Sequence, residues 1–182
     1  IEDVKPPVRL SFTPYFSTYW LHDDEKNASS YSFKGGLGLK YGINESFTLD
    51  MMLIPDFGQV QSDDPVLNLS TVETYYNERR GFFTEGTELF NKAGIFYSRR
   101  IGAQPTDYWN VYSGLNEQEE VVENPSETQI LNATKVSGRT NKGLGIGFLN
   151  AITTNTYAKV RNNETGEERE VKTQVWTNYS VV

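Results

Sequence analysis

Acidic and basic side chains gather in one stretch of the chain that lacks the alternation of a strand. Residues 77–90 read NERRGFFTEGTELF, and the segment IFYSRRIG follows at 95–102. Paired carboxylates act as acid and base in glycoside hydrolysis when their separation and pKa values suit. The candidates are four glutamates with four arginines nearby: Glu73, Glu78, Glu85, Glu88, Arg79, Arg80, Arg99 and Arg100.

The same residues also fit an ion-pair network, which is the interpretation we favour. An arginine fork binds a carboxylate through two hydrogen bonds, and buried charges need partners. Apolar residues that could anchor such a segment stand among the charges, namely Phe82, Phe83, Leu89 and Phe90. We therefore expect residues 55–92 to form a plug-like element that faces the inside of the fold and is held by Arg–Glu pairs.

Metal and cofactor chemistry finds little support in the sequence. His22 lies in the polar stretch HDDE, and Asp56, Asp63 and Asp64 lack the glycine and glutamate spacing of a calcium loop. The chain has no cysteine, no G-x-S-x-G elbow and no phosphate-binding glycine loop. We predict no metal site, no cofactor and no enzymatic activity.

Four aromatic residues could offer a stacking surface for sugars: Trp20, Tyr108, Trp109 and Tyr112. Aromatic rings of this kind more commonly belong to a core or to the aromatic girdle of a membrane barrel. Carbohydrate binding or glycan processing in the cell envelope therefore stays as the alternative function.

Alternating apolar and polar residues predict that strands position these groups. The clearest pattern spans 31–43 and continues after the turn Asn44–Ser46 into 47–53, as in a hairpin. Further strands are expected at 8–16, 93–102, 130–153, 156–162 and 171–182, with a polar loop at 21–30 and an acidic loop at 103–129. The sequence thus predicts an all-β antiparallel meander of six or seven strands.

Three architectures fit this pattern: a soluble sandwich, a soluble ligand-binding barrel and part of an outer-membrane barrel. The strand face opposite the apolar one is rich in Gly, Ser, Thr, Asn and Lys, which is typical of a membrane barrel's interior. No apolar run is long enough for a membrane-spanning helix. A net charge of −7 argues against a nucleic-acid partner. The chain reads as a single β domain over 1–182 and as a fragment of a larger barrel.

A longer linear pattern resembles a known family. Its positions are Pro55-Asp56-Phe57, Gln59-Val60, Asp63, Asn68-Leu69, Glu73, Glu78-Arg79-Arg80, Phe82-Phe83, Glu85, Leu89-Phe90 and 96–102, with the hairpin SGRTNKGLGIGFLNA beyond. Gly81 departs from the pattern, which has proline there. The pattern resembles uncharacterised Gram-negative envelope proteins in which a carbohydrate-binding family nine-like domain precedes a predicted outer-membrane β-barrel.

That resemblance implies a location in the outer membrane of a Gram-negative bacterium, with lipid as the main partner and other envelope proteins or glycans as further partners. It brings no established activity. From the residues themselves we expect a structural, transport or scaffold role.

Overall fold

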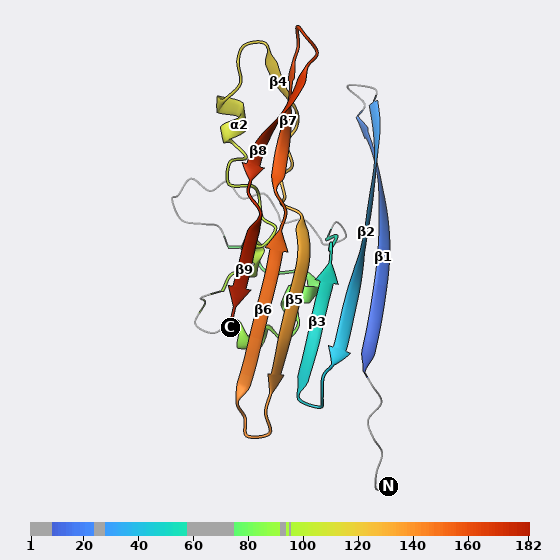
Figure 1. Ribbon diagram of the computed structural model, residues 1–182, viewed down its shortest axis with the longest axis vertical. Coiled ribbons are helices and arrows are strands. Elements are labelled where there is room, and N and C mark those ends of the chain that lie inside the picture. The colour runs from blue at the N-terminus through green and yellow to red at the C-terminus, as the bar shows by residue number, and fades with distance from the viewer. Residues whose placement is uncertain (1–8, 24–27, 58–74, 92–93, 95) are drawn as a thin grey trace.

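The computed structural model describes residues 9–23, 28–57, 75–91, 94 and 96–182, and it contains two antiparallel sheets (Figure 1). The larger sheet has the strand order β1-β2-β3-β5-β6-β9, and the smaller sheet has the order β4-β7-β8. The strands are β1 (Leu10–Asp23), β2 (Ala28–Gly42), β3 (Phe47–Leu53), β4 (Glu119–Glu123), β5 (Ile130–Arg139), β6 (Gly145–Thr153), β7 (Thr156–Asn162), β8 (Glu168–Gln174) and β9 (Thr177–Val181). The predicted all-β antiparallel class is confirmed.

The hairpin that joins β2 to β3 follows from its turn chemistry. The side-chain oxygen of Asn44 accepts hydrogen bonds from the backbone N–H groups of Ser46 and Phe47, at 2.8 and 2.9 Å. Such a local side-chain bond stabilises a tight turn. It sets the register in which Leu39 pairs with Met51, so that their side chains share one face of the sheet.

Figure 1 shows that one long hairpin belongs to both sheets. The strand β6 leads into β7, and β8 leads into β9, so that the β7–β8 part extends beyond the ends of β5 and β6. In the smaller sheet, charges pair across the exposed face. Arg169 binds Glu119 at 2.7 Å, and Lys159 binds Glu123 at 2.7 Å.

The smaller sheet has its own core. Val111 of the short helix α2 (Asn110–Ser113) packs with Ala158 and Val160 of β7, and all three are buried. This part of the hairpin therefore has the apolar-in, charged-out arrangement of a water-soluble domain.

The larger sheet has the opposite arrangement. One face carries apolar side chains that are exposed, among them Phe12, Phe16, Phe33, Ile146 and Phe148. Phe33, for example, is 67% exposed. The other face, which we call the inner face, carries glycines and polar or charged side chains, and residues 78–91 and 96–101 cover it.

Two expected strand boundaries are wrong. Residues 21–30 were expected to form a loop, but β1 continues to Asp23 and β2 begins at Ala28, while 24–27 lie outside the described residues. The expected strand at 171–182 is divided between β8 in one sheet and β9 in the other. The break follows from the side chain of Asn155, which accepts a hydrogen bond from the backbone N–H of Trp176 at 2.9 Å.

The expected strand at 93–102 is also wrong, because its described part contains the short 3-10 helix η3 (Ser98–Arg100). The carbonyls of Ser98 and Ile101 accept hydrogen bonds from the guanidinium of Arg80 and are not available to a ladder. The acidic segment 103–129, expected as a loop, contains α2 and β4. Cross-strand pairing with Arg169 and Lys159 converts part of its acidic run into a strand.

The sequence predicts part of a larger barrel, and the described strands do not close into a barrel by themselves. Within those residues, β1 and β9 are the two edges of an open six-stranded sheet. Among the same residues, no helix is long and apolar enough to cross a membrane.

Candidate functional site

The predicted charge cluster centres on one ion pair, between Glu78 and Arg80. The Nε of Arg80 donates to Oε1 of Glu78 at 2.8 Å, and Nη2 donates to Oε2 at 2.7 Å. The same guanidinium donates to the carbonyls of Ile101 at 2.6 Å and of Ser98 at 2.8 Å. A single side chain thus ties the start of the segment 78–90 to residues 98–101.

Both carboxylate oxygens of Glu78 also accept further hydrogen bonds. They accept hydrogen bonds from the backbone N–H of Arg80 at 2.9 Å and from the hydroxyl of Ser98 at 2.6 Å. Burial by itself would raise the pKa of Glu78, but the hydrogen bonds from Arg80 and Ser98 together outweigh burial and hold this pKa below its ordinary value of 4.5. Because both carboxylate oxygens are bound to neighbours, the arrangement favours a structural role over acid–base chemistry.

Aromatic rings enclose this ion pair. The guanidinium of Arg80, 7% exposed, lies 4.4 Å from the ring centre of Phe83 and 5.4 Å from that of Phe57. A cation over an aromatic face is attracted to it, most strongly where water is excluded. Phe83 is also in edge-to-face contact with Phe82, at 5.0 Å between ring centres.

The segment 78–90 continues onto the inner face through the helix α1 (Gly81–Thr84) and the 3-10 helix η1 (Thr87–Leu89). Phe82, Phe83 and Phe90 are buried in one core with Ala133, Leu149 and Ala151 of β5 and β6. Glycine permits this approach: a Cβ placed on Gly147 would lie 2.8 Å from the ring of Phe90. The phenylalanines therefore anchor the segment to β5 and β6.

Charges on the strands hold the other side of the segment. Lys135 of β5 is 2% exposed, and its Nζ donates to the carbonyls of Phe82 and Glu85, each at 2.6 Å. Lys40 of β2 forms an ion pair with the carboxylate of Glu85. Burial lowers the pKa of Lys135, although the carboxylates of Asp50 and Glu85 act in the opposite direction.

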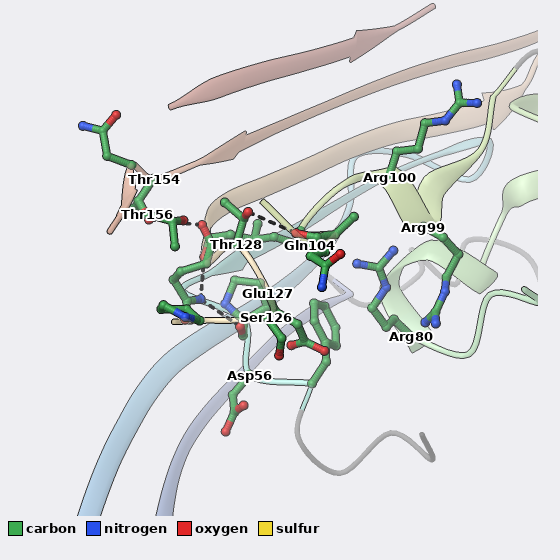
Figure 2. A pocket seen from close by; sticks show the side chains of 18 of the residues that line it. Asp56, Arg80, Arg99, Arg100, Gln104, Ser126, Glu127, Thr128, Thr154 and Thr156 are labelled. Carbon is green, nitrogen blue, oxygen red and sulfur yellow. Dashed lines mark hydrogen bonds between the residues drawn. The ribbon is translucent and has the colours of Figure 1, made fainter. Parts of the chain in front are cut away.

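A cavity of about 920 Å³ lies beside the ion pair, where the two sheets meet (Figure 2). Figure 2 shows Arg80 and Arg99 on one side of it, with Asp56 apart from them and with Thr156 on the opposite side. The side chain of Arg100 extends away from those of Arg80 and Arg99 (Figure 2). The carboxylate of Asp56 accepts a hydrogen bond from the hydroxyl of Tyr19 and lies 3.5 Å from Nζ of Lys34.

The remaining predicted site residues are dispersed. Asp63, Asn68 and Glu73 lie outside the described residues, and so does Asp64. Arg79 is exposed, and Glu88 forms a solvent-exposed ion pair with Arg139 at 3.6 Å. The ring of His22 is hydrogen-bonded to the hydroxyl of Ser29 at 2.9 Å. In the described part of the chain, no group of three or more acidic, His or Cys residues could hold a metal ion.

Three of the four candidate sugar-stacking residues do meet. Trp109 lies 5.0 Å from Tyr108 and 6.0 Å from Tyr112 between ring centres, and Trp109 is 69% exposed. The fourth, Trp20, lies on β1 in the larger sheet and is exposed on its apolar face.

Sequence reasoning missed Lys40 and Lys135, the strand residues that bind the segment 78–90, and Asp50, which pairs with both lysines. The sequence did contain an indication, since all three lie on the glycine-rich face of predicted strands. Charged residues on such a face indicate that something polar covers it.

Comparisons with known proteins place the chain in a family without assigning an activity to it. Neither the curated proteins nor the solved structures gave a match to the chain. A family model described as a domain of unknown function (DUF5916) matches residues 6–182, nearly the whole chain. The chain belongs to the DUF5916 family.

Proposed function

We propose that the larger sheet is part of the wall of an outer-membrane β-barrel in a Gram-negative bacterium. In this proposal the protein has a structural, transport or scaffold role and no enzymatic activity. The segment 78–90 then faces the lumen. One observation carries the proposal: the exposed face of the larger sheet is apolar, and its covered face is charged and rich in glycine.

This arrangement of an exposed apolar face and a covered charged face is the reverse of the arrangement that is stable in water. A sheet in a water-soluble protein buries its apolar face, whereas a barrel strand turns its apolar face to lipid and its polar face to the lumen. Buried charges such as Lys135 and Arg80 need partners, and the lumen-facing segment supplies them. The strands β5 and β6, with 10 and 9 residues, have the length of tilted membrane strands.

The long hairpin supports the same proposal because its exposed side chains change from apolar to charged where it passes from the larger sheet to the smaller one. Its lower part exposes Ile146 and Phe148, whereas its upper part exposes Lys159 and Glu168. At the junction between the two parts, Trp176 is exposed. Aromatic residues prefer the boundary between lipid and water, and the smaller sheet would then lie in the aqueous phase.

The test replaces an apolar residue with arginine in each sheet. Phe148 in the larger sheet is 40% exposed, and Val122 in the smaller sheet is 43% exposed, so they form a matched pair. Folding of the intact protein into lipid vesicles is measured by urea titration. We expect Phe148→Arg to cost about 2–4 kcal/mol if it lies near the middle of the bilayer. Val122→Arg should cost less than about 0.5 kcal/mol.

The proposal is wrong if the wild-type protein folds as a monomer in buffer without lipid or detergent. It is also wrong if both arginine variants fold into vesicles as well as the wild type does.

The aromatic cluster Tyr108, Trp109 and Tyr112 favours a second candidate, a carbohydrate-binding envelope protein. Exposed rings that are held together can stack on the C–H faces of a sugar. Binding to a glycan array that Trp109→Ala abolishes would support it. Binding that Trp109→Ala leaves unchanged would exclude this cluster as the site.

A further inference from the structure

The cavity beside Arg80 is large enough for a ligand of several rings. Its volume of about 920 Å³ lies at the upper end of the range for small-molecule sites, roughly 300–1,000 Å³. Four separate parts of the chain line it, including the β3 end at Pro55, η3, the loop before β5 and the start of β7.

The cations around the cavity are already engaged. Arg80 binds Glu78, Lys34 lies 3.5 Å from Asp56, and the guanidinium of Arg100 lies 5.9 Å from the ring centre of Tyr97. Arg99 also interacts with a neighbour. An anionic ligand would have to compete with these partners.

The lining side chains that have no described hydrogen bond or ion pair are neutral or acidic. Gln104, Ser126 and Glu127 make no side-chain hydrogen bond or ion pair with the rest of the described chain. They offer an amide, a hydroxyl and a carboxylate, which together donate to and accept from hydroxyl groups. A carboxylate without a cationic partner also repels an anion.

Two tyrosines of the lining supply flat apolar surface. Tyr157 at the start of β7 is 37% exposed, and Lys172 lies over its ring at 5.6 Å from the centre. Tyr76 makes its only described hydrogen bonds through backbone atoms, so its phenol is uncommitted. A pyranose ring presents C–H groups on its faces and hydroxyls at its edges, which suits aromatic rings with polar groups around them.

We propose that this cavity binds a short, uncharged oligosaccharide. Tyr157 contacts a sugar face, while Gln104 and Glu127 bind hydroxyls at its edge. The proposal does not depend on the membrane location. It shares its ligand class with the second candidate function but places the sugar at a different site.

The experiment is calorimetric titration of the intact protein in detergent with maltotriose, cellotriose and chitotriose. We expect at least one of them to bind with a dissociation constant in the millimolar range or below. Tyr157→Ala should weaken that binding about fivefold or more, and Tyr157→Phe should retain it. Ser126→Trp, a substitution at an exposed position that fills the cavity, should abolish binding even if Tyr157→Ala fails to fold.

Two controls locate the site and define the ligand. The exposed Glu117→Gln should leave the affinity unchanged. Titrations with inorganic phosphate and with spermidine should show no saturable binding. The proposal is overturned if none of the three sugars binds, if Ser126→Trp does not reduce binding, or if only phosphate or spermidine saturates the protein.

Discussion

The guanidinium of Arg80 and the carboxylate of Glu78 face each other through two parallel hydrogen bonds, of 2.8 and 2.7 Å, next to the rings of Phe57 and Phe83. This pair fixes the point at which the segment 78–90 turns onto the inner face. Its side chains are 8% and 14% exposed, so neither charge has water as a substitute partner.

Glu78→Gln should therefore destabilise the fold by about 3–5 kcal/mol, because it leaves the charge of Arg80 buried without a counter-ion. Equilibrium urea unfolding measures the change. The control is Glu88→Gln, since Glu88 and Arg139 form an exposed pair, and it should cost less than about 1 kcal/mol. Equal effects of the two substitutions would contradict a central role for Glu78.

Acid should remove the contribution of Glu78. Its pKa is lowered in the folded state, so below pH 4.5 the unfolded state binds more protons than the folded state. The stabilisation is complete above that pH and is lost as the pH falls through the folded-state pKa. The difference in unfolding free energy between wild type and Glu78→Gln should thus be constant above pH 4.5 and should narrow below it. A difference that does not change with pH would show that the pKa of Glu78 is the same in the folded and unfolded states.

Gly147 should tolerate no side chain. A Cβ there would lie 2.8 Å from the buried ring of Phe90, so Gly147→Ala should cost roughly 1–3 kcal/mol. Gly38→Ala is the matched control on the same inner face, where the new Cβ would lie 3.6 Å from Thr13, an ordinary contact. If Gly147→Ala is as stable as Gly38→Ala in urea, Phe90 does not pack on β6.

Lys135 should hold the helix α1 against the sheet. Lys135→Met removes the donor to the carbonyls of Phe82 and Glu85, and hydrogen exchange of the backbone N–H groups at 83 and 85 should accelerate about tenfold or more. Lys40→Met removes a partner from the exposed carboxylate of Glu85 and should change these rates less than about threefold. Similar rates in both variants would mean that the backbone contacts of Lys135 do not restrain α1.

The alternation of residues was sufficient to predict the class and most strands, because a strand with one apolar face leaves a period of two in its sequence. It was also sufficient to predict that Phe82 and Phe83 anchor a non-periodic segment. The local sequence pattern gave the wrong prediction where a side chain far away in the sequence determines the backbone conformation. Arg80 binds the carbonyls of Ser98 and Ile101, which prevents the strand expected at 93–102.

Long-range pairing explains the other differences. The run of glutamates that includes Glu119 and Glu123 has the composition of a solvated loop. It forms a strand because Arg169 and Lys159 pair with these two glutamates. The division of 171–182 between two sheets depends on Asn155, which lies 21 residues before its partner Trp176 at the break. The cavity is formed by segments far apart in sequence, so local pattern did not predict it, although Pro55, Phe57 and Arg99 of the family-like pattern line it.

The orientation of the larger sheet is most directly tested by spin labels, because the chain has no cysteine of its own. Single cysteines at Phe33, Ile146 and Phe148 on the apolar face, and at Lys159 and Glu170 on the smaller sheet, are labelled in the protein in lipid vesicles. We predict that labels at the first three positions are relaxed more by oxygen, which concentrates in lipid, than by a water-soluble nickel complex. Labels at the last two should show the reverse. Preferential relaxation by nickel at Phe33, Ile146 and Phe148 would contradict the membrane wall.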